Sequence, residues 1–441
     1  MKVVIVGGVA GGATAAARIR RLNEEAEVVV FERSGYISYA NCGLPYYIGD
    51  VITDSEELTL QTPESFFSRF HVDMKVRHEV LSIHPERKTV SVRNLETGEE
   101  FEEHYDKLLL SPGARPVQPE IPGVGLENLF TLRTVEDTMR IKAYIETHQP
   151  KSVVLAGGGF IGLELAENLR ESGMDVTIVQ RAKQLMNPFD PDMASFIHSE
   201  MRRHGVTLAL GHTVEGFVEK EGGIDVLLKG EDPIHADMGI LAIGVAPDAK
   251  LAGEAGIKLG IKGSIVVNER METSIPDIYA VGDAVQIKNA VSGEEDLISL
   301  AGPANKQGRI AADNICGGNS SYSGAQGSSV IKVFDMTAAT TGLNEKRAKK
   351  LGIDTDKVIL SPMSHAGYYP GGKVMTMKVL FEKETNRLLG AQVVGYEGVD
   401  KRIDVLATAI HAGMKATDLK ELDLAYAPPY SSAKDPVNMA G

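Results

Sequence analysis

The sequence predicts an α/β protein with two copies of a strand–turn–helix–strand unit, followed by a separate C-terminal α+β domain. The apolar run 2–6 ends in a glycine cluster, after which come a helical segment and a second apolar run at 27–32. The same order recurs over 151–180. Continuous apolar runs are typical of strands buried on both faces of a parallel sheet, so the repeat predicts two doubly wound domains. A chain of 441 residues is also too long for one hydrophobic core.

The composition is that of a folded globular protein and excludes several kinds of partner. Hydrophobic residues make up 43% and charged residues 24%, which argues against a disordered chain. No apolar run reaches the roughly 18 residues that a membrane-spanning helix needs. Acidic residues outnumber basic ones by 60 to 46, so a nucleic-acid backbone would be repelled. We therefore expect no nucleic-acid or membrane partner, and we expect any anionic ligand to be held by a local basic cluster.

The chain has only two cysteines, Cys42 and Cys316, which is too few for a disulfide framework or a cysteine metal cluster. We expect a cytoplasmic protein with reduced thiols and no bound metal. The N-terminal apolar run has some features of a signal peptide, but it ends in glycines without a small-residue cleavage site. We therefore expect it to be the first strand.

Segments rich in proline and glycine divide the chain further. Residues 113–124 and 244–250 are predicted to cross between domains, and the small polar stretch after Cys316 is predicted to be a linker. Beyond this linker the pattern predicts strands at 328–342, 373–383 and 387–395 and a helix at 398–413. The expected domains are residues 1–112 with 250–322, residues 113–249, and residues 323–441.

The second glycine turn has the complete pattern of a dinucleotide cradle. Gly157, Gly159 and Gly162 have the GxGxxG spacing between a predicted strand and helix, where a pyrophosphate sits on a helix N-terminus. The following strand ends at Gln180, and Arg181 comes next, so no carboxylate there opposes a 2′-phosphate. NADH and NADPH both remain open as ligands.

The first glycine turn is a looser version of the same cradle. Gly7 and Gly12 occupy the outer positions with Gly8 beside them, while Val9 stands where the middle glycine is usual. Glu32 ends the next strand, where a carboxylate accepts hydrogen bonds from a ribose. We expect a second dinucleotide at this turn.

A third segment indicates which dinucleotide binds first. The strand predicted near 273–281 ends in Gly282 and Asp283. With two cradles upstream, this pair resembles the signature by which flavoprotein reductases hold the FAD ribityl chain. The fold class is therefore two Rossmann-like nucleotide-binding domains, for FAD and NAD(P), plus the C-terminal α+β domain, and the FAD domain is discontinuous.

Cys42 lies in SYANCGLPYY, where the strand that ends at Glu32 delivers the thiol towards the flavin. Two-cysteine disulfide reductases need a CxxxxC pair at this place, and the residues directly after Cys42, GLPYY, contain no second cysteine. A single thiol must cycle with an external group as a mixed disulfide, a persulfide or a sulfenic acid. Cys316, at the end of a predicted helix, is interpreted as structural.

Long motifs along the whole chain carry a resemblance. They are GGVAGGA, SYANCGLPYY, LLLSPGARP, GGGFIGLE, YAVGD, LAGPANKQGRIAADN, HAGYYPGG, GVDKRIDVL and YAPPYSSAKDPVNM. The chain resembles the coenzyme A-disulfide reductase and NADH-dependent persulfide reductase group of single-cysteine FAD pyridine nucleotide-disulfide oxidoreductases. The resemblance implies an FAD that takes hydride from a nicotinamide and passes two electrons to Cys42. Longer members carry a rhodanese domain after the equivalent of NMAG, the motif at which this chain reaches Gly441.

The resemblance also implies a coenzyme A groove leading to the thiol. Thr14, Arg18 and Arg21 fall on one stripe of the first helix, where arginines suit phosphates by forked hydrogen bonding. A solvated surface stripe is the alternative interpretation. The positions that the resemblance assigns to the coenzyme are Thr14, Arg18, Arg21, Ser38, Asn41, Lys75, Lys306 and Lys434.

Two tyrosines complete the implied site. Tyr368 and Tyr426 match hydroxyls that in this group reach across a homodimer interface to the other subunit's cysteine. A phenol there can donate a hydrogen bond to a thiolate or a proton to a leaving thiol. Tyr369 and Tyr430 are adjacent alternatives. The cofactor positions expected from the motifs are Gly7, Gly8, Gly12, Glu32, Arg33, Gly113, Gly157, Gly159, Gly162, Gln180, Arg181, Gly244, Gly282, Asp283 and Ala301.

The expected activity is an NAD(P)H-dependent flavoprotein reductase of coenzyme A disulfide or of coenzyme A persulfide or polysulfide. The alternative is an NADH oxidase or peroxidase in which Cys42 cycles through a sulfenic acid, and a non-enzymatic redox-sensing flavoprotein is a third. The basic stripe favours the first, because oxygen and peroxide need no phosphate groove. We also expect Cys42 to be a thiolate at neutral pH because it lies beside the flavin.

Overall fold

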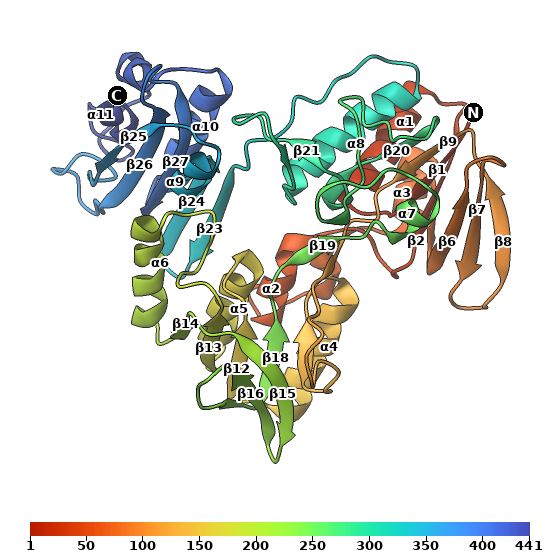
Figure 1. Ribbon diagram of the computed structural model, residues 1–441, viewed down its shortest axis with the longest axis horizontal. Helices are drawn as coiled ribbons and strands as arrows, with labels where there is room; N and C mark the ends of the chain where they lie inside the picture. Colours follow the sequence, from red (N-terminus) through yellow and green to blue (C-terminus); the bar gives the residue numbers. More distant parts are fainter.

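The computed structural model describes residues 1–441 and contains three units, each built on a five-stranded sheet (Figure 1). The first sheet is parallel, and its central strand β1 pairs with β2 on one side and β9 on the other. A strand from much later in the chain, β20, extends this sheet beside β9. In sheet order the strands are β20 (Ile278–Ala280), β9 (Lys107–Leu110), β1 (Lys2–Val6), β2 (Glu27–Glu32) and β5 (Asp73–Val76).

Two helices far apart in sequence cover one face of this sheet. They are α1 (Ala10–Leu22) and α8 (Ala301–Ile315), which pack side by side (Figure 1). A Cβ at Gly308 would lie 2.4 Å from the carbonyl oxygen of Gly11, so a glycine is needed where the helices meet. The other face packs against a three-stranded sheet. Its strands are β6 (His78–His84), β7 (Thr89–Asn94) and β8 (Glu100–His104), and the helix α3 (Pro63–Phe70) precedes β5.

The second unit repeats the parallel arrangement. Its strands in order are β11 (Leu129–Thr131), β18 (Met238–Leu241), β12 (Ser152–Ala156), β13 (Asp175–Gln180) and β14 (Thr207–Leu210). Its helices are α4 (Val135–His148), α5 (Phe160–Glu171) and α6 (Pro191–Arg203), and it carries the small sheet β15 (Val214–Lys220), β16 (Gly223–Leu228) and β17 (Ile234–Ala236). The two segments predicted to cross between domains pair with each other, as β10 (Ala114–Pro116) against β19 (Val245–Pro247).

The third unit is an antiparallel sheet with α10 (Val399–His411) packed on it. Its strands in order are β23 (Ser329–Val333), β24 (Met336–Gly342), β27 (Leu388–Gly395), β26 (Met375–Glu382) and β25 (Thr355–Leu360), and the short helices are α9 (Glu345–Lys350) and α11 (Pro436–Ala440). The single strand expected at 328–342 is wrong, because Phe334 has φ of 53° and turns the chain into a hairpin. No helix of the chain combines the length and the apolar character needed to span a bilayer.

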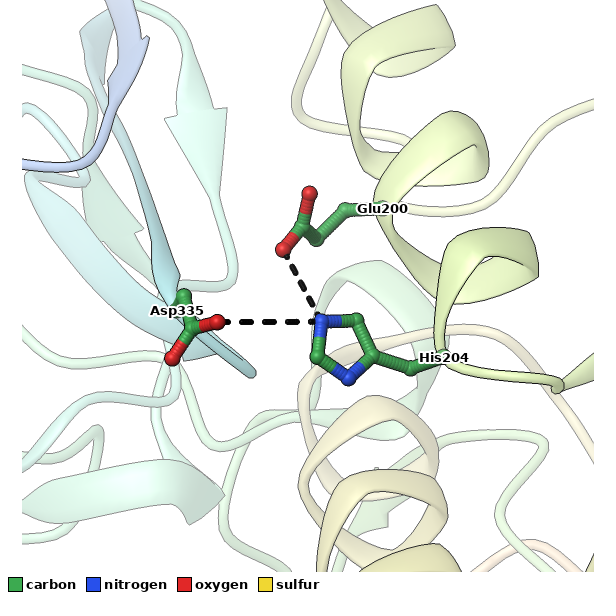
Figure 2. Close-up of side chains that lie close together, drawn as sticks. All are labelled: Glu200, His204 and Asp335. Carbon is green, nitrogen blue, oxygen red and sulfur yellow. Dashed lines mark ion pairs between the residues drawn. The ribbon is translucent and has the colours of Figure 1, made fainter. Parts of the chain in front are cut away.

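A polar cluster joins the third unit to α6 (Figure 2). His204 Nε2 lies 3.2 Å from Glu200 Oε1 and 3.9 Å from Asp335 Oδ2 in the hairpin turn. The His204 ring stacks on Phe334 with centroids 4.0 Å apart, and Tyr396 donates to Glu200 Oε2 at 3.0 Å. Three such side chains could in principle hold a metal ion. Because Arg203 also donates to Glu200 Oε1, both carboxylate oxygens already have partners, and we interpret the cluster as a contact between units.

Candidate active site

Cys42 lies in a short 3-10 turn that we call the redox turn (Asn41–Gly43). The turn connects β3 (Ile37–Tyr39) to α2 (Leu44–Ile48), which packs on α5 of the second unit. The cysteine is free and exposed, with no second cysteine beside it. The thiol therefore sits between the first and second units, where it is open to an external reactant.

The protein groups around Cys42 do not by themselves favour a thiolate. Removal of water from the sulfur is the largest cause raising the pKa of Cys42, and the Glu164 carboxylate raises it further. The Arg133 guanidinium lowers this pKa, and Asp283 opposes that effect. The thiolate predicted from the sequence therefore depends on the flavin, and it stays a prediction.

The first glycine turn has the shape that a dinucleotide requires. A Cβ at Gly7, whose φ is 97°, would lie 2.1 Å from the carbonyl oxygen of Ser111. A Cβ at Gly12 would lie 1.9 Å from the oxygen of Gly7, so α1 approaches β1 only because both residues are glycines. Glu32 is buried and accepts from Gly8 N at 2.8 Å, which fixes its carboxylate at the mouth of the turn. These residues fit the adenosine half of an FAD.

The backbone conformation at the middle position of each cradle explains why the first motif can have Val9 where the second has Gly159. Val9 has φ of −102° and Gly159 has φ of −92°, and both are conformations that any residue adopts. A Cβ at Gly159 would meet nothing within 4 Å, so this glycine leaves open space beside the helix N-terminus. Valine at the first site therefore costs no backbone strain.

The other expected flavin positions lie around the same sheet edge. Gly282 has φ of 81° and donates its N–H to the buried Gln307 at 2.7 Å, which orients the following Asp283. Arg33 is exposed and pairs with Asp248 at 2.9 Å, and Ala301 begins α8. Gly113 and Gly244, in the two crossing segments, have φ of 74° and 116°.

The second cradle repeats the geometry with a neutral side chain. A Cβ at Gly157 would lie 2.2 Å from the carbonyl oxygen of Ala242, and one at Gly162 would lie 2.1 Å from the oxygen of Gly157. Gln180 accepts from Gly158 N at 3.3 Å and thus takes the place that Glu32 has in the first unit. Arg181 beside it is exposed. The site fits a nicotinamide dinucleotide, and NADH and NADPH both remain open.

One acidic residue near the thiol was missed by the sequence reasoning. Glu164 lies on α5 and makes no hydrogen bond or ion pair through its carboxyl group. Burial raises the pKa of Glu164 to about 7, and Glu167 adds to the rise. Its position in the sequence could have indicated it, because Glu164 stands two residues after Gly162 on the helix that begins at the second cradle.

A groove between α1 and α8 brings together four of the residues assigned to coenzyme A. Its volume is about 310 Å³, and no hydrophobic side chain lines it. Thr14 donates to Asn305 at 2.8 Å, and Arg18 donates to Asp313 at 2.8 Å, so both helices hold the arrangement. We call this the basic groove, and its lining residues are Thr14, Arg18, Arg21, Asn305, Lys306 and Arg309.

Asn305 and Arg309 of this groove were not predicted. The signal was present, because Asn305, Lys306 and Arg309 fall at helical spacing within 301–315 and so share one face. Which face of α8 meets α1 depends on contacts between segments far apart in the chain. The sequence pattern of α8 by itself does not reveal that partner.

Other residues assigned to coenzyme A lie elsewhere. Asn41 begins the redox turn, and Ser38 lies on β3 just before it. Lys75 pairs in register with Phe31, on the sheet face opposite α1, and lies 6.0 Å from the Phe101 ring centroid. The structure therefore does not bring Lys75 into the basic groove, because alternate residues of β5 face opposite sides. Lys434 belongs to the C-terminal unit.

The two predicted tyrosines meet in the C-terminal unit. The phenol oxygens of Tyr368 and Tyr426 are 2.7 Å apart, and both side chains are exposed. Of the alternatives, Tyr369 packs edge-on against His365, and Tyr430 has no hydrogen bond through its phenol. The pairing distinguishes Tyr368 and Tyr426 from their neighbours.

Comparisons with known proteins agree along the whole chain. Residues 1–308 match the model of the pyridine nucleotide-disulphide oxidoreductases, and residues 328–436 match the dimerisation domain of that family. The coenzyme A disulfide reductase of Staphylococcus aureus strain JH9 is 38% identical over 443 residues, which covers 100% of this chain and 99% of that protein.

Solved structures give the same result. The reduced CoADR-RHD of Bacillus anthracis is 52% identical with a TM-score of 0.97, over 100% of this chain and 79% of that one. The NAD-dependent persulfide reductase of A. fulgidus is 38% identical with a TM-score of 0.97, over 100% and 82%. The water-forming NADH oxidase of Lactobacillus brevis is 30% identical with a TM-score of 0.95, over 100% and 97%.

Proposed function

The chain belongs to the pyridine nucleotide-disulphide oxidoreductases, and on that basis we propose that it is an NAD(P)H-dependent reductase of coenzyme A disulfide or of coenzyme A persulfide or polysulfide. The observation that carries the choice of substrate is the basic groove, which is lined only by polar and cationic side chains. A nucleotide with several phosphates suits such a surface. Molecular oxygen and peroxide have no group that would use it.

The proposed chemistry starts at Cys42. Its thiolate attacks one sulfur of the substrate disulfide, which forms a mixed disulfide with one coenzyme A and expels the other as a thiolate that takes up a proton. Bound FAD would supply the two electrons, received from the nicotinamide as hydride, that break the mixed disulfide. The second coenzyme A then leaves as a thiol, and Cys42 returns to the thiolate or thiol. Residues of the first glycine turn with Glu32 would hold the FAD, and those of the second with Gln180 would hold the nicotinamide dinucleotide.

The match to the dimerisation domain indicates a homodimer. We extend this to an active site shared between subunits, in which Tyr368 and Tyr426 of one subunit face Cys42 of the other. Support comes from the exposure of the two phenols and from their hydrogen bond, which presents both hydroxyls at one place. Lys434 would reach the coenzyme of the other subunit in the same way.

The bounds of the three domains and the location of the protein are also part of the proposal. The FAD domain comprises residues 1–112 and 250–322, the NAD(P) domain residues 113–249 and the dimerisation domain residues 323–441. The strand β20, which pairs beside β9, supports the discontinuous first domain. A cytoplasmic, reducing location suits the two unpaired cysteines.

A direct test is the mass of the purified protein, denatured without reduction. We expect an adduct of coenzyme A mass on Cys42, absent from Cys42→Ser and retained in Cys316→Ser. An unmodified thiol together with NADH consumption that follows oxygen, and not coenzyme A disulfide, would favour the oxidase. Both activities are measured because the chain is also 30% identical to the Lactobacillus oxidase.

A further inference from the structure

One arginine outside the predicted site touches three segments around Cys42. Arg133 stands immediately before the N-cap of α4, and its side chain is 22% exposed. Its Nε donates to the carbonyl oxygen of Ala114 at 3.0 Å, in the crossing segment that leads out of the first unit. Its Nη2 pairs with Asp283 Oδ2 at 3.1 Å, in the turn expected to hold the ribityl chain.

The third contact reaches the redox turn itself. With the Asn41 amide oriented for hydrogen bonding, its oxygen accepts from Arg133 Nη1 at 3.1 Å and its nitrogen donates to the Arg133 carbonyl at 3.0 Å. Asn41 is the residue before Cys42. Gly113 lies directly beside the guanidinium, and a Cβ there would be 3.3 Å from Nη2.

We propose that Arg133 is a positioning residue of the active site, which holds the redox turn against the crossing segment and the Gly282–Asp283 turn. The proposal rests on the proposed function only for the role of Cys42. Each of the three guanidinium nitrogens bonds a different segment. A planar fork of donors can do this, whereas a lysine ammonium presents its donors at one point.

The same contacts place a permanent positive charge near the thiol. The charged groups that act on Cys42 are Glu164 from α5, Asp283 from its turn and Arg133, and only Arg133 is a cation. Tyr46 on α2 is a further titratable neighbour, and burial raises its pKa to about 12, so it stays neutral. Without Arg133, burial and the two carboxylates would raise the pKa of Cys42, and no cation among these groups would lower it.

The test is the pH profile of Cys42 alkylation by iodoacetamide in the reduced, FAD-loaded dimer, with Cys316→Ser as background. Arg133→Gln should raise the apparent pKa of Cys42 by about one unit, so that alkylation is about tenfold slower at pH values below the apparent pKa of the parent. Arg133→Lys should recover part of this shift but not the full turnover rate, because it keeps the charge and loses the fork. Arg115→Gln is the control and should match the parent, because Arg115 is exposed in the same crossing segment and its side chain makes no hydrogen bond or ion pair.

A profile of Arg133→Gln identical to those of the parent and of Arg115→Gln would overturn the proposal. If Arg133→Gln loses FAD, Asn41→Ala removes only the link to the redox turn. Asn41→Ala should slow alkylation at least about threefold at pH values below the apparent pKa of the parent, with FAD retained, because the thiol is no longer held beside the guanidinium. An unchanged rate in Asn41→Ala would also overturn the proposal. Alkylation needs no coenzyme A, so a normal response of the thiol with no coenzyme A turnover would count against the proposed function alone.

Discussion

Tyr368 and Tyr426 are separated by 58 residues, yet their phenol oxygens lie 2.7 Å apart in a shared hydrogen bond. The hydrogen bond from Tyr368 is the largest cause raising the pKa of Tyr426. Both side chains are exposed, by 76% and 47%, on a unit that contains no cysteine. The two hydroxyls therefore form one donor group available to something outside their own unit.

We predict that the two tyrosines act as a pair. Tyr368→Phe and Tyr426→Phe should each lower kcat with coenzyme A disulfide at least about tenfold, because each loses a proton donor or its orienting partner. The double variant should lose no more than the stronger single variant. Steady-state kinetics of the four proteins completes the cycle, with Tyr369→Phe as the control. Independent, multiplicative losses would contradict the pairing.

Cys42→Ser should keep bound FAD and its reduction by NAD(P)H but lose disulfide and persulfide turnover. The reason is that Cys42 is the only thiol at the redox turn, since Cys316 caps the far end of α8. Stopped-flow absorbance measures flavin reduction, and thiol release measures turnover. Residual turnover above a few per cent of the parent would remove Cys42 from its role. A long-wavelength charge-transfer absorbance should be present in the reduced parent and absent from the variant.

Arg18→Ala combined with Arg21→Ala should raise KM for coenzyme A substrates about 10- to 100-fold. The variant loses two charge-assisted contacts to phosphates. Each contact contributes less binding free energy than a buried one would, because the basic groove is open to water. KM for a small disulfide without phosphates should stay within about twofold. Arg309→Ala should shift KM in the same direction, since Arg309 lines the same groove. Equal losses for both substrates would mean that the stripe supports the fold.

Glu164→Gln should change the dependence of stability on pH. The folded pKa of Glu164 is about 7 against 4.5 for an ordinary glutamate, so the folded state binds more protons in this window and stability falls as pH rises through it. The variant should therefore have a higher Tm than the parent at pH 8 and a similar Tm at pH 5. Calorimetry of the FAD-loaded dimer measures this. Glu171→Gln, exposed on the same helix, should show no such gain at pH 8.

Lys378→Met should destabilise the contact between the C-terminal unit and α6. Lys378 is 1% exposed and bonds Asp192 at 2.9 Å, Asp190 at 3.0 Å and Glu345. Removing the ammonium leaves Asp190 and Asp192 without their cation and Glu345 with Lys357 alone, a loss of about 3–5 kcal/mol in the free energy of unfolding. Denaturant titration measures it. Lys357→Met, an exposed partner of the same Glu345, should cost at most about 1 kcal/mol.

Much of the nucleotide-binding architecture could be predicted because its causes are local. Gly7 and Gly157 hold positive φ angles at the ends of apolar strands, and the next strand ends at Glu32 or Gln180 in each unit. A turn with positive φ favours glycine, and a strand buried on both faces is continuously apolar, so both features can be read from the residues themselves. The hairpin at Phe334 was missed because Asp335 is the only typical turn residue there, and it stands between β-branched and apolar runs that continue the strand pattern on both sides.

The sequence by itself determined the two repeated units, the order of the cradles and the single thiol, since each depends on residues close together in the chain. Only the tertiary structure decided that Thr14 meets Asn305 across 291 positions, that Lys75 faces away from that groove, and that Arg133 bonds the turn beside Cys42. The physical reason is that these contacts depend on which faces of distant elements pack together. Helical spacing and strand alternation specify the faces of an element but not the partner that each face meets.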